Sequence, residues 1–350
     1  MEKRVLLTGG TGVVGGEVLY QLLSDGRFCV DVAGRRSSRE FFNRLRSRLR
    51  GRSGFFSAED WIKSVQDRLN YIQSDLVKSE CRRLDKSILE CKYIVHCAGN
   101  THFRPSVKWQ NSAIASNLVG SIERASNGGA CRLLIAMGTA ASRGAVISGG
   151  SVYHNPYTLD KRRAQKQFEE ELVDSVSLCV LSPTIVLPSK TFGLKWVSQV
   201  AWWVPAYLQS GGVPVDMDSK LDFTTSMAVA DSVMRVINNH ERAYRDVYRK
   251  EYHLGCGGNY VKIGQILSMA KKIYCSHEGI VALGKASRLR VNRLLSEYIP
   301  YIENRDCVSS QDAVIDRIYV APTHEELVDQ VKQILVRMRS VFESCSDFAP

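Results

Sequence analysis

RVLLTGGTGVVG, residues 4–15, joins an apolar run to a glycine-rich turn close to the start of the chain. Residues 4–8 have the composition of a short buried strand, and apolar residues at helical spacing continue from Val18 to Leu23 before Gly26. In this context a GxxGxxG motif binds a dinucleotide, because the glycines let backbone approach a pyrophosphate at the positive end of the helix. The predicted cofactor residues of this turn are Thr8, Gly9, Gly12, Val13, Val14 and Gly15.

The residues after the second predicted strand, 28–34, indicate which dinucleotide is bound. A chain that binds NAD usually offers an acidic side chain to the ribose hydroxyls at this position. Here Gly34 is followed by Arg35 and Arg36, whose guanidinium groups suit a 2′-phosphate. The nearest acid, Asp31, comes too early, within the strand itself. We therefore expect NADPH/NADP⁺ rather than NADH.

Further strands alternate with helices along the first half of the chain. Apolar runs at 69–76, 93–100, 132–137 and 178–181 predict an α/β fold with a Rossmann-type, doubly wound parallel sheet. Ligands of such sheets bind at the carboxyl ends of the strands. Asp75 ends one strand where it can meet the adenine, and the small residues Ala98, Gly99 and Asn100 end another, leaving room for the cofactor. His96 and His102 are expected to be ordinary strand and loop histidines with satisfied hydrogen bonds.

Tyr157 and Lys161 lie four residues apart in HNPYTLDKRRAQKQFEE, which has a helical pattern. At this spacing both side chains project from one helix face. A fixed ammonium beside a phenol favours the phenolate, so we expect the tyrosine pKa to fall from its usual value of about 10. Carbonyl reduction needs such an acid to protonate the new alkoxide as hydride arrives. The pair occurs by chance on many helices, so its weight comes from the glycine turn that precedes it.

The size and composition favour one large domain or two closely joined ones. With 350 residues, 44% of them hydrophobic, the chain can bury a substantial core, at about 150 residues per domain. We expect a cofactor domain at residues 1–188 that also carries the catalytic residues. Residues 189–350 are expected to form a smaller, mainly substrate-binding α/β region that returns some segments to the sheet. Ten cysteines without CxxC pairs or His/Cys clusters indicate neither a disulfide framework nor a metal site.

The apolar runs indicate neither export nor membrane insertion. Val5–Leu7 meets the glycine turn at once and is too short for the core of a signal peptide. The longest run, Val197–Leu208, is well below the roughly 20 residues of a membrane span. With reduced cysteines as the plain interpretation, we expect a cytoplasmic protein without a transmembrane segment.

The formal net charge of +11 is concentrated between residues 35 and 52, where eight arginines face one acid, Glu40. One interpretation is a solvated helix with its arginines outward and Phe41, Phe42, Leu45 and Leu49 inward. The other is an anionic partner: the cofactor phosphate, coenzyme A or an acidic carrier protein. Nucleic acid is not expected, because no aromatic-plus-basic recognition motif accompanies the run.

Together these segments resemble the extended short-chain dehydrogenase/reductases. The resemblance rests on TGGTGVVG, Arg35-Arg36, Asp75, HCAGN, NLVG, the strand end at Thr139 and YTLDK, in this order, over residues 4–188. The chain looks most similar to the fatty-acyl and thioester reductases of the male-sterility type. Those proteins share the long basic insertion after the second strand, a phrase like IVHCAGNTHFRPSV and a late segment like Tyr298–Tyr301.

The resemblance implies roles for individual residues. It makes Tyr157 the general acid/base, puts Lys161 on the nicotinamide ribose beside it, and puts Thr139 on the substrate carbonyl. Asn117 matches the helix asparagine that supports the proton relay or the sheet. The implied catalytic set is Thr139, Tyr157, Lys161 and Asn117. Beyond the glycine turn and the two arginines, the implied cofactor set is Asp75, Leu76, Ala98, Gly99, Asn100, Tyr157, Lys161, Pro183, Thr184 and Ile185, and no metal is implied.

Three positions depart from the usual residues of this branch. Gly138 stands in place of the serine before the catalytic threonine, and Asp160 in place of the serine before Lys161. Ser182 stands in place of the frequent arginine before Pro183. None of these changes removes a catalytic group, so we expect retained activity with a reorganised substrate pocket.

The expected reaction is NADPH-dependent reduction of a ketone, aldehyde or acyl thioester on a hydrophobic or aromatic substrate, free or carried on coenzyme A or a carrier protein. Relatives build their substrate pocket from the segment that corresponds to 190–225. That segment contains Phe192, Trp196, Trp202, Trp203, Pro205, Tyr207 and Phe223, which also suit a core or a dimer contact. Homodimers are common in the superfamily.

Two alternative functions remain open. The first is a sugar-nucleotide epimerase or dehydratase that uses NAD(P). Ala140-Ala141 after Thr139 counts against a dehydratase, and Arg35-Arg36 against an epimerase with bound NAD. The second is a regulator that binds NADPH without turning it over.

Overall fold

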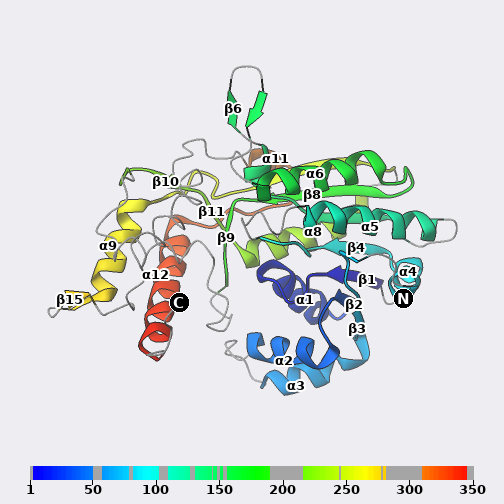
Figure 1. The fold of residues 1–350 in the computed structure, drawn as a ribbon, viewed down its shortest axis with the longest axis horizontal. Coiled ribbons are helices and arrows are strands. Elements are labelled where there is room, and N and C mark those ends of the chain that lie inside the picture. Colours follow the sequence, from blue (N-terminus) through cyan, green and yellow to red (C-terminus); the bar gives the residue numbers. More distant parts are fainter. Residues whose placement is uncertain are drawn as a thin grey trace.

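The computed structural model describes residues 3–49, 57–78, 82–101, 109–126, 131–143, 145–147, 150–152, 156–189, 216–243, 246–276, 279–280 and 310–344. Its centre is a seven-stranded sheet in the order β12-β8-β5-β4-β1-β2-β3, with every pairing parallel. The strands are β1 (Lys3–Thr8), β2 (Phe28–Gly34), β3 (Leu69–Gln73), β4 (Tyr93–His96), β5 (Leu133–Met137), β8 (Ser177–Pro183) and β12 (Arg249–Leu254). The predicted doubly wound α/β fold is confirmed (Figure 1).

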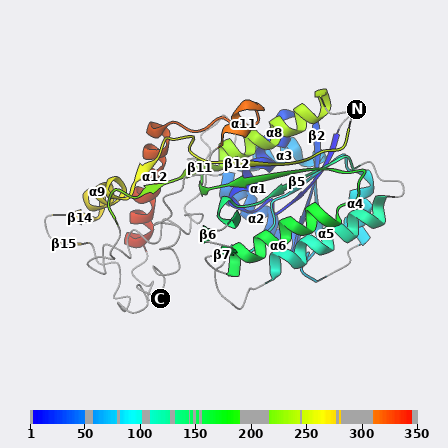
Figure 2. The same ribbon diagram turned by 90° about the horizontal axis from the view of Figure 1, so that it is seen from above.

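Helices cover both faces of this sheet, as Figure 2 shows from above. One face packs against α1 (Val13–Asp25), α2 (Ser38–Leu49), α3 (Ala58–Val65) and α8 (Ser226–Ala243). The other packs against α4 (Arg82–Glu90), α5 (Gln110–Ser126) and α6 (Pro156–Glu171). Successive strand residues alternate between the two cores, with Val5 and Leu7 on the α1 side and Leu6 on the α5 side. Because both faces are covered, central strands such as β5 are buried along their whole length.

The direction of the chain reverses between β1 and β4, and this reversal positions the site. Val5 of β1 pairs with Val30 of β2 on one side and with Tyr93 of β4 on the other. The connections that leave these strands diverge to opposite faces, which opens a crevice outside their carboxyl ends. The glycine turn after β1 and the loop after β4 both lie at this crevice.

Local sequence decides where several helices begin and end. α1 ends at Gly26, whose φ of 82° lies in the left-handed region that favours glycine. At the start of α2 the Glu40 amide donates to Ser37 Oγ and the Ser37 amide to Glu40 Oε2, which forms a capping box. Thr323 and Glu326 form the same kind of box at the start of α12 (His324–Ser344).

A third apolar core lies beside the main sheet, between α9 (Ile263–Tyr274) and α12. Leu327, Val331 and Leu335 of α12 are buried there. β12 pairs with β8, so this later segment joins the main sheet. The remaining elements are η1 (Gln66–Arg68), η3 (Ala140–Arg143), β6 (Ala145–Ile147), β7 (Gly150–Val152), β9 (Ile185–Leu187), β10 (Lys220–Leu221), β11 (Phe223–Thr225), β13 (Val261–Lys262), β14 (Cys275–Ser276), β15 (Gly279–Ile280) and α11 (Gln311–Ile315).

Some residues singled out from the sequence lie outside the described residues. They are His102, Phe192, Trp196, Trp202, Trp203, Pro205, Tyr207, Tyr298–Tyr301 and the last two arginines of the basic run. Of the predicted substrate-pocket residues, Phe223 is described, and it is buried in the third core.

Candidate active site

The glycine turn is closely packed against the loop that follows β4. Gly9 has a φ of 71°, and a Cβ at this position would lie 2.5 Å from the Ala98 nitrogen. A Cβ on Gly15 would lie 2.3 Å from the Gly9 carbonyl oxygen, which also accepts the Gly12 amide at 2.8 Å. Gly12 caps α1, whose first turn carries no acid. The positive end of α1 therefore faces the turn with its backbone amides, which suits an anionic ligand such as a diphosphate.

Arg48, near the end of α2, lies behind this turn. Its side chain is 2% exposed and donates to the Gly12 carbonyl. Burial lowers the pKa of Arg48 to about 9, and the nearby Glu17 opposes that shift. The expectation that the arginines of α2 face outward is therefore wrong for Arg48, because α2 packs its last turn against α1.

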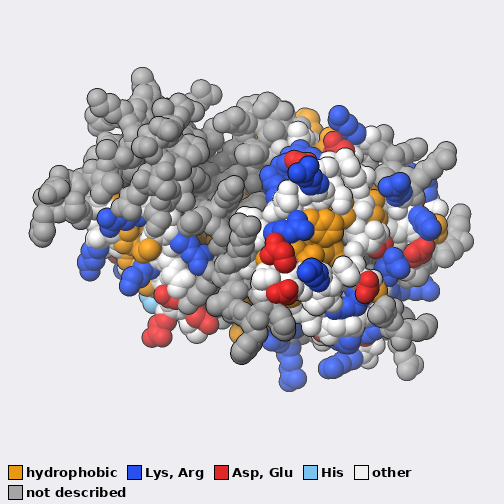
Figure 3. Space-filling model, turned by 90° about the horizontal axis from the view of Figure 1, so that it is seen from below, with side chains coloured by type: hydrophobic (Ala, Val, Ile, Leu, Met, Phe, Trp, Pro, Cys, Tyr) orange, Lys and Arg blue, Asp and Glu red, His pale blue; other side chains and the backbone are white. Residues whose placement is uncertain are grey.

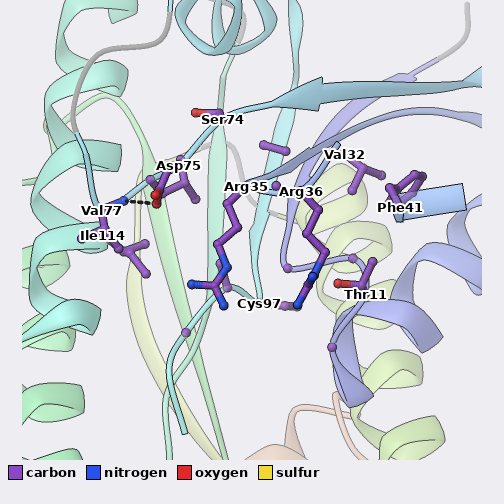
Figure 4. A pocket seen from close by; sticks show the side chains of 18 of the residues that line it. Thr11, Val32, Arg35, Arg36, Phe41, Ser74, Asp75, Val77, Cys97 and Ile114 are labelled. Atoms are coloured by element: carbon purple, nitrogen blue, oxygen red, sulfur yellow. Dashed lines mark hydrogen bonds between the residues drawn. The ribbon is translucent and has the colours of Figure 1, made fainter. Parts of the chain in front are cut away.

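A cavity of about 300 Å³, which we name the glycine-turn cavity, opens at the carboxyl ends of β1, β2 and β4 (Figure 4). The predicted cofactor residues that line it are Gly9, Gly12, Arg35, Arg36, Asp75, Leu76, Ala98, Gly99 and Asn100. Other lining residues are Thr11, Val32, Phe41, Arg44, Tyr71, Ser74, Gln110 and Ile114. Thr8, Val13, Val14 and Gly15 are not among the described lining residues; they belong to the strand and helix that support the turn.

Three arginines gather at the mouth of this cavity. Arg35 and Arg36 extend from the end of β2 in Figure 4, and Arg44 of α2 lines the same space. Burial lowers the pKa of Arg44, and the neighbouring Arg36 and Arg35 lower it further. Figure 3 views the side of the molecule where α2 and α3 lie, and Lys and Arg side chains are prominent on it. The cluster can receive a second anionic group, beyond the one at the glycine turn.

The backbone that carries these arginines is fixed by aromatic side chains. Tyr71 donates to the carbonyl oxygens of Gly34 and Arg36, at 2.9 and 2.7 Å, and its ring stacks on Phe41 with centroids 4.4 Å apart. Sequence reasoning missed Tyr71, Phe41 and Arg44 as parts of the site. Arg44 stood in the basic run, but only the packing of α2 shows that it turns toward the cavity.

Asp31, the other acid considered for the cofactor ribose, is used elsewhere. It is buried within β2 and accepts hydrogen bonds from Ser87 Oγ at 2.6 Å and from Arg4 Nη1 at 3.2 Å. Asp31 is not among the described residues that line the glycine-turn cavity. The structure thus agrees with the interpretation that this acid comes too early in the strand.

Tyr157 contacts Thr139, and Lys161, four residues later on α6, lies beside the glycine-turn cavity. Thr139 follows β5, and the other two stand on the first turns of α6. The Thr139 side chain hydrogen-bonds Tyr157, and the Lys161 ammonium donates to the Met137 carbonyl at 3.0 Å. A Cβ on Gly99 would lie 3.1 Å from Lys161 Nζ. Since Gly99 lines the cavity, Lys161 adjoins the space formed by the glycine turn.

Burial dominates the pKa values of this group. It raises the pKa of Tyr157 to about 12, although the hydrogen bond from Thr139 acts in the opposite direction. It lowers the pKa of Lys161 to about 8, against the influence of Cys97 and Asp160. The expectation that the tyrosine pKa falls is wrong for this structure. Burial removes water from the phenol and raises its pKa, and the Lys161 ammonium, which donates to the Met137 carbonyl, does not offset this effect.

The comparisons with known proteins fit this geometry. Residues 5–247, more than half of the chain, match the family described as the NAD dependent epimerase/dehydratase family. The chain belongs to this family. It corresponds to the extended short-chain dehydrogenase/reductases predicted from the motifs, and its members depend on a nicotinamide dinucleotide. No curated protein matches the sequence.

Solved structures share the fold at low sequence identity. The terminal R domain of the myxalamid PKS-NRPS pathway is 16% identical, with a TM-score of 0.71 over 100% of this chain and 92% of that one. A thiolation-reductase di-domain from an archaeal non-ribosomal peptide synthetase is 13% identical, with a TM-score of 0.68 over 97% and 91%. A UDP-N-acetylglucosamine 4-epimerase from Methanobrevibacter ruminantium M1 is 16% identical, with a TM-score of 0.58 over 97% and 99%. At these identities the likeness shows the fold alone, and both reductases and epimerases share it.

In this member of the family, Asp160 links α6 to α5. Its carboxylate is 1% exposed and accepts the Asn111 amide at 2.8 Å, the Ser112 amide at 3.1 Å and Ser112 Oγ at 2.6 Å. These donors belong to the first turn of α5, so Asp160 caps a helix distant in sequence. The departure from serine before Lys161 therefore has a structural role next to Lys161.

The structure places two asparagines of α5 differently. The Asn111 side chain accepts the Asn100 amide at 2.8 Å, and a Cβ on Gly99 would lie 2.9 Å from its Oδ1. Asn117, six residues later, donates instead to the Leu76 carbonyl at 2.8 Å. Asn117 thus holds the loop predicted to meet the adenine, whereas Asn111, which sequence reasoning missed, lies next to Lys161. The NLVG motif singles out Asn117, whereas no motif singles out Asn111.

His96 is a structural histidine, as expected. Its Nδ1 lies 2.8 Å from Thr8 Oγ1, which also accepts the Ala98 amide at 3.1 Å. Burial lowers the pKa of His96 to about 3, and the charge of Lys161 contributes. His96 therefore remains neutral and helps Thr8 hold the loop after β4 against the glycine turn.

Pro183 is the last residue of β8 and pairs with Leu254 of β12, Thr184 follows it, and Ile185 begins β9. The Thr184 amide donates to the Leu254 carbonyl at 3.0 Å, and the Ile185 amide to the Asp222 carbonyl at 3.3 Å. These residues are not among the described ones that line the glycine-turn cavity. Among the described helices none is long and apolar enough to cross a bilayer, and that part of the chain contains no cluster of three metal-ligating side chains.

Proposed function

We propose that the protein reduces a carbonyl group of a hydrophobic substrate with NADPH as the hydride donor. One observation carries the proposal: Tyr157, hydrogen-bonded to Thr139, stands four residues before Lys161 on α6, and Lys161 borders a glycine-lined cavity. A binding module needs the cavity but has no use for a hydrogen-bonded pair of hydroxyls next to a buried ammonium. In this pair the Tyr157 phenol can act as the general acid that protonates an alkoxide.

The residues divide the chemistry in a simple way. The dinucleotide, when bound, supplies the hydride. Thr139 and Tyr157 hold the carbonyl oxygen of the substrate, and Tyr157 gives its proton to that oxygen as negative charge develops. Lys161 then stabilises the phenolate that is left. With a pKa of about 12, Tyr157 carries its proton at neutral pH, which suits reduction rather than oxidation.

The described residues fit a dinucleotide with a 2′-phosphate. A Cβ at Gly9 would collide with the Ala98 backbone, and one at Gly15 would collide with the Gly9 carbonyl. Glycine at both positions therefore permits the tight turn that lets a diphosphate approach the backbone. Arg35, Arg36 and Arg44 stand where an NAD-binding protein offers an acid to the ribose, and Asp31 is committed to Ser87 and Arg4. This arrangement supports NADP⁺/NADPH over NAD⁺/NADH. We assign Asn117 to the adenine side of the site rather than to the proton relay, and Asn111 to the support of Lys161.

Two observations bear on the class of substrate. Two proteins that share the fold are described as a reductase domain of a PKS-NRPS pathway and as a thiolation-reductase di-domain. The basic face around α2 also suits an acidic carrier protein or coenzyme A. We therefore place an acyl thioester first, ahead of a free aldehyde or ketone.

The decisive test measures NADPH consumption with a long-chain acyl-coenzyme A, a fatty aldehyde and a polycyclic ketone, with products identified by mass spectrometry. We expect turnover with at least one of them, lost in Tyr157→Phe and retained in Tyr274→Phe. Tyr274 is a matched control, since its buried hydroxyl donates to the Leu335 carbonyl in the third core. Stoichiometric NADPH binding without oxidation would indicate the regulator instead. Co-purified NAD and inversion of a UDP-sugar would indicate the epimerase.

A further inference from the structure

Two of the sequence departures, Gly138 and Ser182, are neighbours in the structure. The Gly138 amide donates to the Leu181 carbonyl at 2.8 Å, which extends the pairing of β5 with β8 by one residue. A Cβ on Gly138 would lie 2.4 Å from Ser182 Oγ, a separation that real Cβ atoms do not show. The next nearest atom, Val180 Cγ1, would be 3.1 Å away and needs to move by only a few tenths of an ångström. The Ser182 hydroxyl is therefore the main obstacle to a side chain at position 138.

The Ser182 hydroxyl is held in place from the other side. It is fully buried and donates to Glu251 Oε1 of the neighbouring strand β12 at 2.8 Å. His253 Nε2, two residues further along β12, lies 3.6 Å from the same carboxylate oxygen. Rotation of Ser182 away from position 138 would break its bond to Glu251 inside the protein, where a lost hydrogen bond is not replaced by water.

The residue next to this contact is Thr139, whose hydroxyl bonds Tyr157. Its carbonyl is fixed on the far side by Ser142, which donates from its amide at 2.9 Å and from its hydroxyl at 2.8 Å. Thr139 is thus held between Ser142 and the contact of Gly138 with Ser182. Because Ser142 fixes the backbone after Thr139, a backbone shift caused by a side chain at position 138 would be confined to Gly138 and Thr139.

We propose that Ser182, held by Glu251, is a positioning residue for Thr139, and that Gly138 and Ser182 form a matched pair. The hydroxyl at 182 occupies the space that a side chain at 138 would need, so a side chain at 138 requires a residue at 182 without that hydroxyl. The steric pairing stands by itself. The effect on turnover rests on the proposed function, in which Thr139 holds the substrate carbonyl.

The test compares Gly138→Ala, Ser182→Ala and the double variant with the wild-type protein. Gly120→Ala is the control for the added methyl, because a Cβ there would meet nothing nearer than Arg124 Nη1 at 3.4 Å. Ser232→Ala is the control for the lost hydroxyl, since Ser232 is equally buried and donates to the Ala228 carbonyl at 2.9 Å. Readouts are kcat and KM, the Kd for NADPH, and crystal structures that locate Thr139 Oγ.

We expect Gly138→Ala to lower kcat about 100-fold, the cost of displacing one catalytic group by about 1 Å, with KM and the Kd for NADPH nearly unchanged. Removal of the Ser182 hydroxyl in the same chain should recover at least about tenfold of that loss and return Thr139 Oγ to its wild-type position. Both controls should behave as wild type. A double variant as slow as Gly138→Ala, or a Gly138→Ala variant with Thr139 Oγ in place, would overturn the pairing.

The two proposals can fail separately. Absence of turnover in the wild-type protein with all carbonyls would contradict the reductase function, while the crystal structures would still decide the pairing. Displacement and return of Thr139 Oγ without any change in kcat would keep the pairing and refute the positioning role.

Discussion

Replacement of Asp160 by alanine should loosen the start of α5 and, through it, both halves of the site. The buried carboxylate accepts hydrogen bonds from the Asn111 amide, the Ser112 amide and the Ser112 hydroxyl. Asn111 in turn fixes Asn100 and borders Gly99, next to Lys161. One side chain on α6 therefore supports the loop after β4 and the surroundings of Lys161 together.

The magnitude follows from the donors that lose their acceptor. Loss of a helix N-cap side chain costs about 1–2 kcal/mol, and a buried donor left without an acceptor costs about 1–3 kcal/mol. Water that enters the space of the missing carboxylate would accept some of the hydrogen bonds from the three donors. We therefore expect the free energy of unfolding to fall by about 3 kcal/mol. For a chain of this size, at about 2 °C per kcal/mol, the midpoint of thermal unfolding should fall by about 6 °C.

Thermal unfolding followed by circular dichroism measures this effect. Asp85→Ala is the matched control, because it removes the same charge from a pair with Arg124 of α5 that lies near the surface. We expect that control to cost less than about 1 kcal/mol. Asp160→Ala should also lower the pKa of Lys161 below its value of about 8, since Asp160 raises it. Midpoints of the two variants within 1 °C of each other, at the resolution of about 0.5 kcal/mol that this implies, would refute the capping role of Asp160.

Three further predictions concern the cofactor site and the pH dependence. Alanine at both Arg36 and Arg44 should weaken NADPH binding at least about tenfold and leave NADH binding within about twofold, in fluorescence titrations; an equal loss for both cofactors would argue against a 2′-phosphate site. Arg48→Met should lower the free energy of unfolding by about 3 kcal/mol in denaturant titrations, because it leaves Glu17 buried near an apolar side chain. Glu17→Gln in the same chain should restore part of that loss; no recovery would show that the two side chains do not interact. The rate of reduction should fall as pH rises through about 8, where Lys161 loses its positive charge. Cys97→Ser should show the same fall in rate, since burial raises the pKa of the Cys97 thiol to about 12. Loss of the pH dependence in Cys97→Ser would assign it to the thiol instead.

The sheet and the glycine turn could be predicted from the sequence because both depend on local pattern. Val5, Leu6 and Leu7 form a strand that is buried on both faces, and the glycine spacing after it suits one backbone geometry. The capping boxes at Ser37 and Thr323 are equally local, and the structure contains both. The catalytic trio could be named from its motifs, although its assignment remains a proposal.

The parts that escaped prediction depend on contacts between distant segments. Arg48 stands in a run of arginines and differs from the others only because α2 packs its last turn behind Gly12. Asp160 caps a helix 49 positions earlier, and no local rule connects it to Asn111. The direction of the Tyr157 pKa shift was also missed, because the cost of burial cannot be estimated from spacing alone.

Transfer of deuterium from NADPH labelled at the nicotinamide C4 tests the central claim most directly, in a single turnover with the carbonyl that the wild-type protein reduces. The account predicts that the label appears on the product carbon with wild-type protein, and that Tyr157→Phe binds the cofactor equally well but transfers none. A Tyr157→Phe variant that transfers deuterium at the wild-type rate would contradict the role of the Tyr157 phenol as the acid beside the glycine-turn cavity.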